Sequence, residues 1–284
     1  MIQNYSTNPM LNRLLAIVIL FSLSGSCNKL YSQHAYKPVV SDPLLEPWRW
    51  KLMPELRGKG VRCIESSKDG SIWFGVDKGI CRYDGISWDF YDTTNSKIVF
   101  PVNSIVDNNG FIIAGSEKGL SIFHNRKWKA LFSKEKNSLL AVSCMKKLSD
   151  GAVLVGFSKG LIYIKNDKYT FLAPERNIKT LKKKFVTEEF IALPDNYLFE
   201  NNSSKVDEIF EYSQDELWIL MSQSTRGKIF KFNLNKAIED KSVAKSEVLF
   251  DLSGNKLYRG LKVIRTKDNK TWIISSYHRS GIFT

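Results

Sequence analysis

Basic residues recur at one kind of position in the chain and could bind an anion. Each stands directly before a glycine or one residue further back from it: Lys78, Lys118, Lys159, Arg226 and Arg279. If their turns share one face of the fold, the summed positive field would attract an anionic ligand to that face. A solvated turn residue, inherited with a repeated sequence, is the alternative explanation of the same pattern.

Groups suited to catalysis are sparse. Catalysis needs side chains that converge on one pocket, whereas His34, His124 and His278 share neither a strand nor a ligand spacing. The acidic residues lack the alternation of a calcium loop, and no glycine-rich phosphate loop is present. We therefore expect no catalytic residue, no bound metal and no cofactor in this chain.

The cysteines also show no metal or redox pattern. Cys27, Cys63, Cys81 and Cys144 form neither a CxxC pair nor a zinc spacing. We expect the last three to be buried thiols that pack as small hydrophobic side chains.

The elements that would position the basic residues are repeats of about 40 residues. Three glycines recur at matching positions when 40 is added to the residue numbers of the first unit and 41 to those of the second. Apolar positions between them also keep step, and two weaker copies follow near Trp218 and Trp272. The glycines are Gly70, Gly75 and Gly79, then Gly110, Gly115 and Gly119, then Gly151, Gly156 and Gly160.

Each repeat divides into four short strands with turns between them. In the first unit we predict strands over 61–65, 71–75, 80–83 and 87–91, because Asp-Gly and Lys-Gly pairs between them are typical of tight turns. A period near 40 with four antiparallel strands is typical of a β-propeller blade. The recurring aspartates are then turn residues. The aromatic residues Trp73, Trp88, Trp128, Trp218 and Trp272 are expected to pack one blade on the next.

The predicted fold class is therefore all-β, a β-propeller of about five four-stranded antiparallel blades in an incomplete ring. The predicted units lie near 61–100, 101–140, 141–180, 205–240 and 258–284, within a repeat region of 47–284. We expect Glu46–Leu52 to be an outermost strand without a blade of its own. The longer interval between the third and fourth units contains Lys182, Lys183 and Lys184, which we expect in a loop or an irregular strand.

The first repeat resembles the two-component-regulator propeller repeat. The resemblance rests on Asp69-Gly70, on Ile72-Trp73-Phe74-Gly75 and on Gly79-Ile80 with Tyr83-Asp84, and it weakens in the later copies. Where that family carries Thr after the strand glycine, this chain has Val76, Ser116 and Phe157. The family is common in the periplasmic sensor part of hybrid histidine kinases that respond to polysaccharide fragments. The resemblance thus implies a ligand-sensing propeller, with homodimers if the chain belongs to a sensor kinase.

The N-terminus predicts export. Arg13 precedes the apolar run Leu14–Leu23, and small residues lead to Cys27. Ten apolar residues make a helix of about 15 Å, half of a bilayer core, so 1–27 reads as a signal peptide or lipoprotein signal and 28–46 as a linker. Acylation of Cys27, which would anchor the protein to a membrane, and simple cleavage nearby both remain open.

Export decides which anionic partners are relevant. The net charge of +13 barely changes on export because Arg13 is the only charged residue among the first 26. In the periplasm or at the outer surface nucleic acid is not an expected partner, so an anionic oligosaccharide, such as a uronate or a sulfated glycan, is favoured. The alternatives are a surface scaffold or secretion-associated lipoprotein, and a propeller lyase, whose site could begin only at Tyr277 and His278.

Overall fold

The computed structural model divides the chain into two compact units, Met1–Pro54 and Glu55–Thr284. The described strands all belong to the second unit. Among the described residues, none of the helices has the length and apolar character needed to cross a membrane. The structure describes residues 42, 45–96, 98, 100–133, 141–183, 185, 188–193, 205–223, 226–239, 247–251, 262–274 and 282–283.

The segment before the first repeat contains short helical turns. The strand predicted over Glu46–Leu52 is wrong, since Pro47–Arg49 forms a 3₁₀ helix (η2). Pro47 presets a helical φ at the first position of the turn, and the backbone N–H of Trp50 closes the turn on the carbonyl of Pro47 at 3.2 Å. A second 3₁₀ helix, η3, covers Pro54–Leu56.

Two four-stranded antiparallel sheets follow, and we number the sheets as blades in chain order. The strands predicted for the first repeat are confirmed to within one or two residues. Blade 1 contains β1 (Val61–Ser66), β2 (Ile72–Val76), β3 (Gly79–Tyr83) and β4 (Trp88–Tyr91). Blade 2 contains β5 (Val102–Asn108), β6 (Phe111–Ser116), β7 (Gly119–His124) and β8 (Lys127–Ser133).

Blade 3 has a fifth strand and a helix that the sequence analysis missed. Its antiparallel strands are β9 (Val142–Lys147), β10 (Val153–Phe157), β11 (Gly160–Lys165) and β12 (Lys168–Pro174). Helix α2 (Glu175–Lys182) then leads to β13 (Glu189–Leu193), which pairs in parallel with β12. Parallel neighbours need such a crossover.

Lys182 therefore ends a helix, and its predicted place in a loop or irregular strand is wrong. Ile178 and Leu181 lie three residues apart and bury one face of α2. Basic residues in the last turn are also favourable for the helix dipole. Lys184 lies outside the described residues.

Blades 4 and 5 complete the described part. Blade 4 has the strand order β14-β15-β16-β17, and the short helix α3 (Leu234–Glu239) lies between β16 and β17. Its strands are β14 (Lys205–Ser213), β15 (Glu216–Gln223), β16 (Arg226–Phe232) and β17 (Glu247–Asp251). Blade 5 shows β18 (Lys262–Arg265), β19 (Thr271–Ile274) and β20 (Ile282–Phe283).

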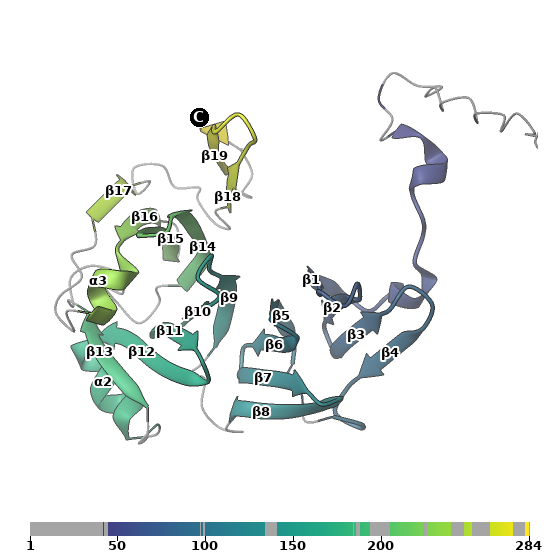
Figure 1. Ribbon diagram of the computed structural model, residues 1–284, viewed down its shortest axis with the longest axis horizontal. Helices are drawn as coiled ribbons and strands as arrows, with labels where there is room; N and C mark the ends of the chain where they lie inside the picture. Colours follow the sequence, from purple (N-terminus) through teal and green to yellow (C-terminus); the bar gives the residue numbers. More distant parts are fainter. Residues whose placement is uncertain are drawn as a thin grey trace, which may run out of the picture. The chain divides into compact units, whose positions relative to one another are not determined.

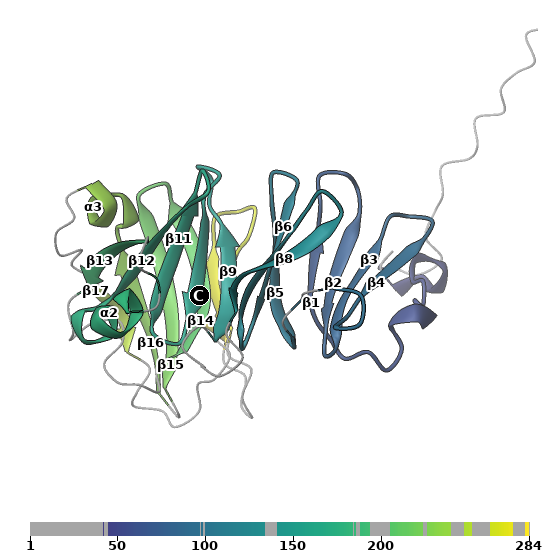
Figure 2. The ribbon, with the colours of Figure 1, turned by 90° about the horizontal axis from the view of Figure 1, so that it is seen from below.

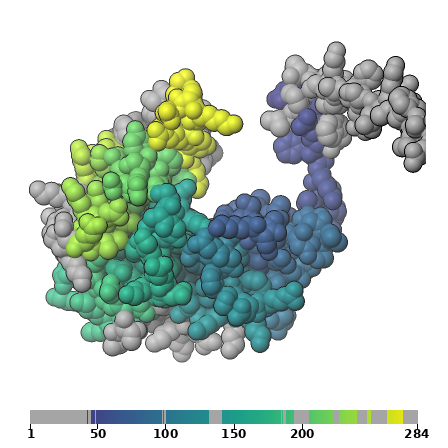
Figure 3. Space-filling view, in the orientation of Figure 1, coloured from purple at the N-terminus to yellow at the C-terminus, as the bar shows by residue number. Residues whose placement is uncertain are grey.

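The blades pack in sequence order through their first strands. β1 contacts β5, β5 contacts β9, β9 contacts β14, and β14 contacts β18, an order that can be followed in Figures 1 and 2. Figure 3 shows the atoms of blades 1 to 4, coloured blue to green, in contact along this succession. The prediction of an all-β propeller is confirmed.

In blades 1, 2 and 3, a glycine within the second strand makes room for the next blade. A Cβ at Gly75 would lie 2.8 Å from the side chain of Val102, which begins β5. At Gly115 it would lie 2.5 Å from the side chain of Val142, and at Gly156 it would lie 2.8 Å from Val206. Such distances are shorter than real Cβ contacts, so each glycine is required by the close approach of the following inner strand.

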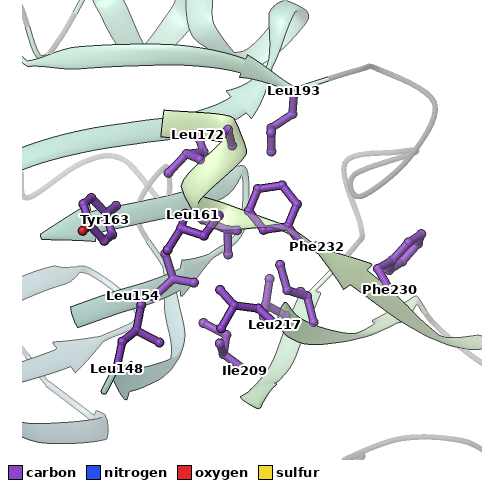
Figure 4. Packing of buried hydrophobic residues seen from close by; sticks show 14 of the residues in the cluster. Leu148, Leu154, Leu161, Tyr163, Leu172, Leu193, Ile209, Leu217, Phe230 and Phe232 are labelled. Carbon is purple, nitrogen blue, oxygen red and sulfur yellow. The ribbon is translucent and has the colours of Figure 1, made fainter. Parts of the chain in front are cut away.

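Apolar clusters between the blades form the core. Trp73 and Trp128 belong to one cluster from blades 1 and 2, and Trp218 joins another from blades 4 and 5, as predicted. Trp88 differs, since its ring stacks on Tyr83 within its own blade at 4.7 Å. The cluster between blades 3 and 4 is shown in Figure 4, where Leu161 and Leu172 lie near Phe232.

Candidate functional site

The Lys-Gly turns lie at corresponding places on blades 1, 2 and 3. They join β2 to β3, β6 to β7 and β10 to β11. The inner strand of each blade begins at the same end, because its first residue pairs with the last residue of the second strand, as Val61 does with Val76. We call this end of the blades the lysine rim and define it by Lys78, Lys118 and Lys159.

The three lysines differ in their surroundings. Lys78 and Lys118 are exposed, whereas Lys159 is half-buried. The backbone N–H of Lys118 donates to Ser116 Oγ at 3.1 Å, so Ser116 has a structural role in its turn. The carbonyl of Lys159 accepts a hydrogen bond from the side chain of Asn177 on α2 at 3.1 Å. This hydrogen bond from α2 stabilises the turn between β10 and β11.

A fourth predicted basic residue, Arg226, lies in a strand. Arg226 is the first residue of β16, paired with Gln223, rather than part of the turn before it. The corresponding pair in blade 1 is Val76 with Gly79, so Arg226 occupies the place of the glycine rather than that of the lysine. Arg279 lies outside the described residues, as do Cys27, His34, Tyr277 and His278.

A hollow opens on the lysine rim at blade 1. It has a volume of about 430 Å³, and its charged lining is Arg57, Lys59, Asp77, Lys78 and Asp92. The carboxylate of Asp77 is already paired, since it accepts from Arg62 Nε at 2.6 Å. The hollow is mixed in charge with a small excess of basic groups, so the positive character of the rim comes from several blades together.

Packing within the blade requires the glycine that follows Lys78 and the glycine that follows Lys159. Gly79 has a φ of +146°, and a Cβ there would lie 2.0 Å from the carbonyl oxygen of Tyr91 on β4. A Cβ at Gly160 would lie 2.4 Å from the carbonyl oxygen of Leu172 on β12. The blade fold therefore explains the glycines, whereas nothing in the packing demands a lysine before them.

The recurring aspartates fix turns at the opposite end of the blades. Asp69 Oδ1 accepts from the backbone N–H and the hydroxyl of Ser71 at 2.9 and 2.6 Å, and Asp150 accepts from the N–H of Ala152 at 3.0 Å. These hydrogen bonds confirm the predicted turn role. The hydrogen bond from the Ser71 hydroxyl lowers the pKa of Asp69, so this carboxylate stays ionised at neutral pH.

The described cysteines are free thiols with little reactivity. Burial raises the pKa of Cys63 to about 11 and that of Cys144 to about 12, and it also raises the pKa of Cys81. Protonated thiols are poor nucleophiles and poor metal ligands. Within the part of the chain that the structure describes, no cluster of three or more His, Cys, Asp or Glu side chains could hold a metal ion.

One feature of the described surface was missed by sequence reasoning. A groove of about 810 Å³ lies between blades 1 and 2, at the end opposite the lysine rim. We call it the inter-blade groove, and its central side chains are Trp73, Arg82, Asp89, Tyr91, Phe123 and Arg126. Arg82 and Asp89 are the signal that could have revealed it, because they break the apolar pattern of the repeat.

Comparison with known proteins shows the fold and leaves the family open. No family model matches the chain, and no curated protein matches it. An extracellular domain, described as that of a hybrid two component system from B. thetaiotaomicron, is similar with a TM-score of 0.50 at 18% identity. The match covers 78% of this chain and 26% of that one, so the chain spans about a quarter of its length.

Two other solved structures have lower TM-scores. A second B. thetaiotaomicron domain with the same kind of description has a TM-score of 0.44 at 16% identity, over 79% of this chain and 32% of that one. Virginiamycin B lyase from Staphylococcus aureus has a TM-score of 0.49 at 14% identity, over 78% of this chain and 69% of that one. Scores this low carry no functional argument.

Proposed function

We propose that the chain is an exported propeller that binds an anionic oligosaccharide on its lysine rim and catalyses no reaction. The observation that carries the proposal is the recurrence of an exposed or half-exposed lysine in the same turn of three successive blades. The packing explains the following glycine but not the lysine, which favours a role in binding.

Binding would take place outside the cytoplasm. The apolar run before Cys27 supports export, with or without acylation of that cysteine. The solved structure with a TM-score of 0.50 is described as an extracellular domain of a hybrid two component system, and the first repeat resembles a sensor propeller. We therefore assign the chain to the sensory part of a signalling protein, with a polysaccharide fragment as the signal.

Binding should depend on the rim lysines and on salt. In the triple variant that combines Lys78→Gln, Lys118→Gln and Lys159→Gln, we expect the affinity for oligogalacturonate or for a sulfated oligosaccharide to fall at least tenfold. Because exposed charges are screened over about 8–10 Å at physiological ionic strength, the unchanged chain should also bind more weakly at 150 mM than at 20 mM NaCl. Titration calorimetry at both salt concentrations measures both effects.

A control with the same change of charge tests whether position matters. The triple variant Lys127→Gln, Lys168→Gln and Lys270→Gln removes three exposed lysines beside turns at the other end of the blades, where β8, β12 and β19 begin. It should keep at least half of the affinity. Equal losses in the two variants, or binding of neutral glycans alone, would contradict the rim as the site. Absence of binding to every anionic glycan would contradict the proposed function itself.

A further inference from the structure

The inter-blade groove is built by two facing rows of side chains. On blade 1, Trp73 pairs across the sheet with Arg82, and Arg82 pairs with Asp89. Tyr91 follows two residues after Asp89 and so lies on the same face. On blade 2, Phe123 packs against both aromatic rings, with centroids 5.0 Å from Trp73 and 5.4 Å from Tyr91. The groove thus has an aromatic floor between polar walls.

The polar wall of blade 1 departs from the repeat. Arg82 and Asp89 form a cross-strand pair of opposite charges, and neither of the corresponding pairs in blades 2 and 3 does so. Those later blades use mostly apolar or uncharged residues on this face, which pack against the following blade. The residues that correspond to Arg82, Asp89 and Tyr91 are Ile122, Lys129 and Leu131 in blade 2 and Tyr163, Thr170 and Leu172 in blade 3.

The charged side chain of Arg82 is held in a fixed position. Its guanidinium contacts Asp69 Oδ2 and Asp89 Oδ2, each at 3.2 Å, and it lies over the Trp73 ring at 5.6 Å. Burial opposes the charge of Arg82, but the hydrogen bonds to Asp89 and Asp69 outweigh burial and raise its pKa. A charged donor clamped in this way presents preorganised hydrogen-bonding groups to the groove.

Other groups of the wall remain available to a ligand. Arg126 is exposed in the turn before β8 and makes no salt bridge to any residue that the structure describes. Burial raises the pKa of Tyr91, so its hydroxyl is protonated at neutral pH and can donate a hydrogen bond. The groove therefore offers both donors and acceptors beside its aromatic floor.

The charges of the groove balance. Its charged lining consists of three basic and three acidic side chains, namely Lys68, Arg82, Arg126, Asp69, Asp84 and Asp89. The balance gives no preference for an anion or a cation, in contrast to the lysine rim. A volume of about 810 Å³ is within the usual range for small-molecule sites.

We propose that the inter-blade groove binds a neutral, polyhydroxylated ring compound, that is, a neutral saccharide unit. A sugar ring has an apolar face that can lie on Tyr91 and Phe123, and its hydroxyls can pair with fixed carboxylates and guanidinium groups around them. This inference goes beyond the proposed function, because it concerns a separate site at the other end of the blades.

The test measures binding of linear xylo-, cello-, malto- and mannopentaose to the full chain by titration calorimetry. Asp89→Asn keeps the shape of the side chain, and Arg126→Ala removes an exposed guanidinium. Each should weaken binding of the recognised pentasaccharide at least tenfold, since hydrogen bonds to charged groups are among the stronger ones. The matched control, Lys127→Ala, removes an adjacent exposed cation outside the groove and should change affinity less than twofold.

Further readouts separate this site from the lysine rim. Binding of a neutral saccharide in the groove should change less than twofold between 20 and 150 mM NaCl, and the rim variant with three glutamines should bind it normally. Unaltered thermal unfolding midpoints would show that the variants remain folded. Failure of all four pentasaccharides to bind overturns this inference, and so does binding by Asp89→Asn and Arg126→Ala that is as strong as binding by the unchanged chain. Retention of salt-dependent binding to acidic glycans in those cases leaves the proposed function standing.

Discussion

Replacement of Phe232 by alanine is expected to lower the free energy of unfolding by about 3–5 kcal/mol. Phe232 is fully buried, with 0% of its surface exposed, in the cluster that joins blades 3 and 4. Figure 4 shows its ring among leucines of blade 3. Removal of the ring would leave a cavity between two blades that are already close-packed, so neither sheet could close it without moving.

Urea unfolding, followed by tryptophan fluorescence, measures this loss. Phe90→Ala is the matched control because Phe90 is 40% exposed on blade 1. It should cost less than about 1.5 kcal/mol, since much of its ring already contacts water. Similar losses in the two variants would show that the contact between blades 3 and 4 does not stabilise the fold as described.

Replacement of Gly79 by alanine is expected to cost about 2–5 kcal/mol. The backbone of Gly79 has a φ of +146°, and an added Cβ would meet the carbonyl oxygen of Tyr91 at 2.0 Å. That oxygen belongs to the backbone of β4 and cannot turn aside as a side chain could. β3 and β4 would therefore have to separate at the lysine rim.

Gly85→Ala separates crowding from conformational strain. Gly85 also has a positive φ, of +97°, but an added Cβ would have no neighbour within 4 Å. Only the backbone preference would oppose this substitution, at about 1–2 kcal/mol. The two unfolding free energies can be compared directly by urea titration. A cost for Gly79→Ala no larger than that for Gly85→Ala would contradict the close approach of β3 and β4.

The blades were predictable from the sequence because their constraints are local. The turn that contains Gly70 needs a positive φ, and Gly75 must accommodate the next inner strand, so both glycines recur in blades 1, 2 and 3. The spacing of the repeats therefore specified four strands a blade. The lysine positions followed from the same alignment, although Arg226 lies within a strand of blade 4.

The parts that sequence reasoning missed depend on contacts outside the repeat. α2 and β13 lie between two repeats, so no other copy could reveal them, and β13 is placed by parallel pairing with β12. The 3₁₀ helix at Pro47–Arg49 was not predicted because the tryptophans at positions 48 and 50 are typical of strands. The inter-blade groove needs the register that brings Arg82 beside Asp89 and the packing of Phe123 from the next blade.

Hydrogen-exchange mass spectrometry with and without an oligogalacturonate tests most directly whether the lysine rim binds an anionic glycan. We predict slower exchange at the turns 77–79, 117–119 and 158–160 when the glycan is bound, in low salt. The turns at the opposite end, 68–70, 108–110 and 149–151, serve as the internal control and should exchange at unchanged rates. Slower exchange at those opposite turns, with no change at the lysine rim, would contradict the account.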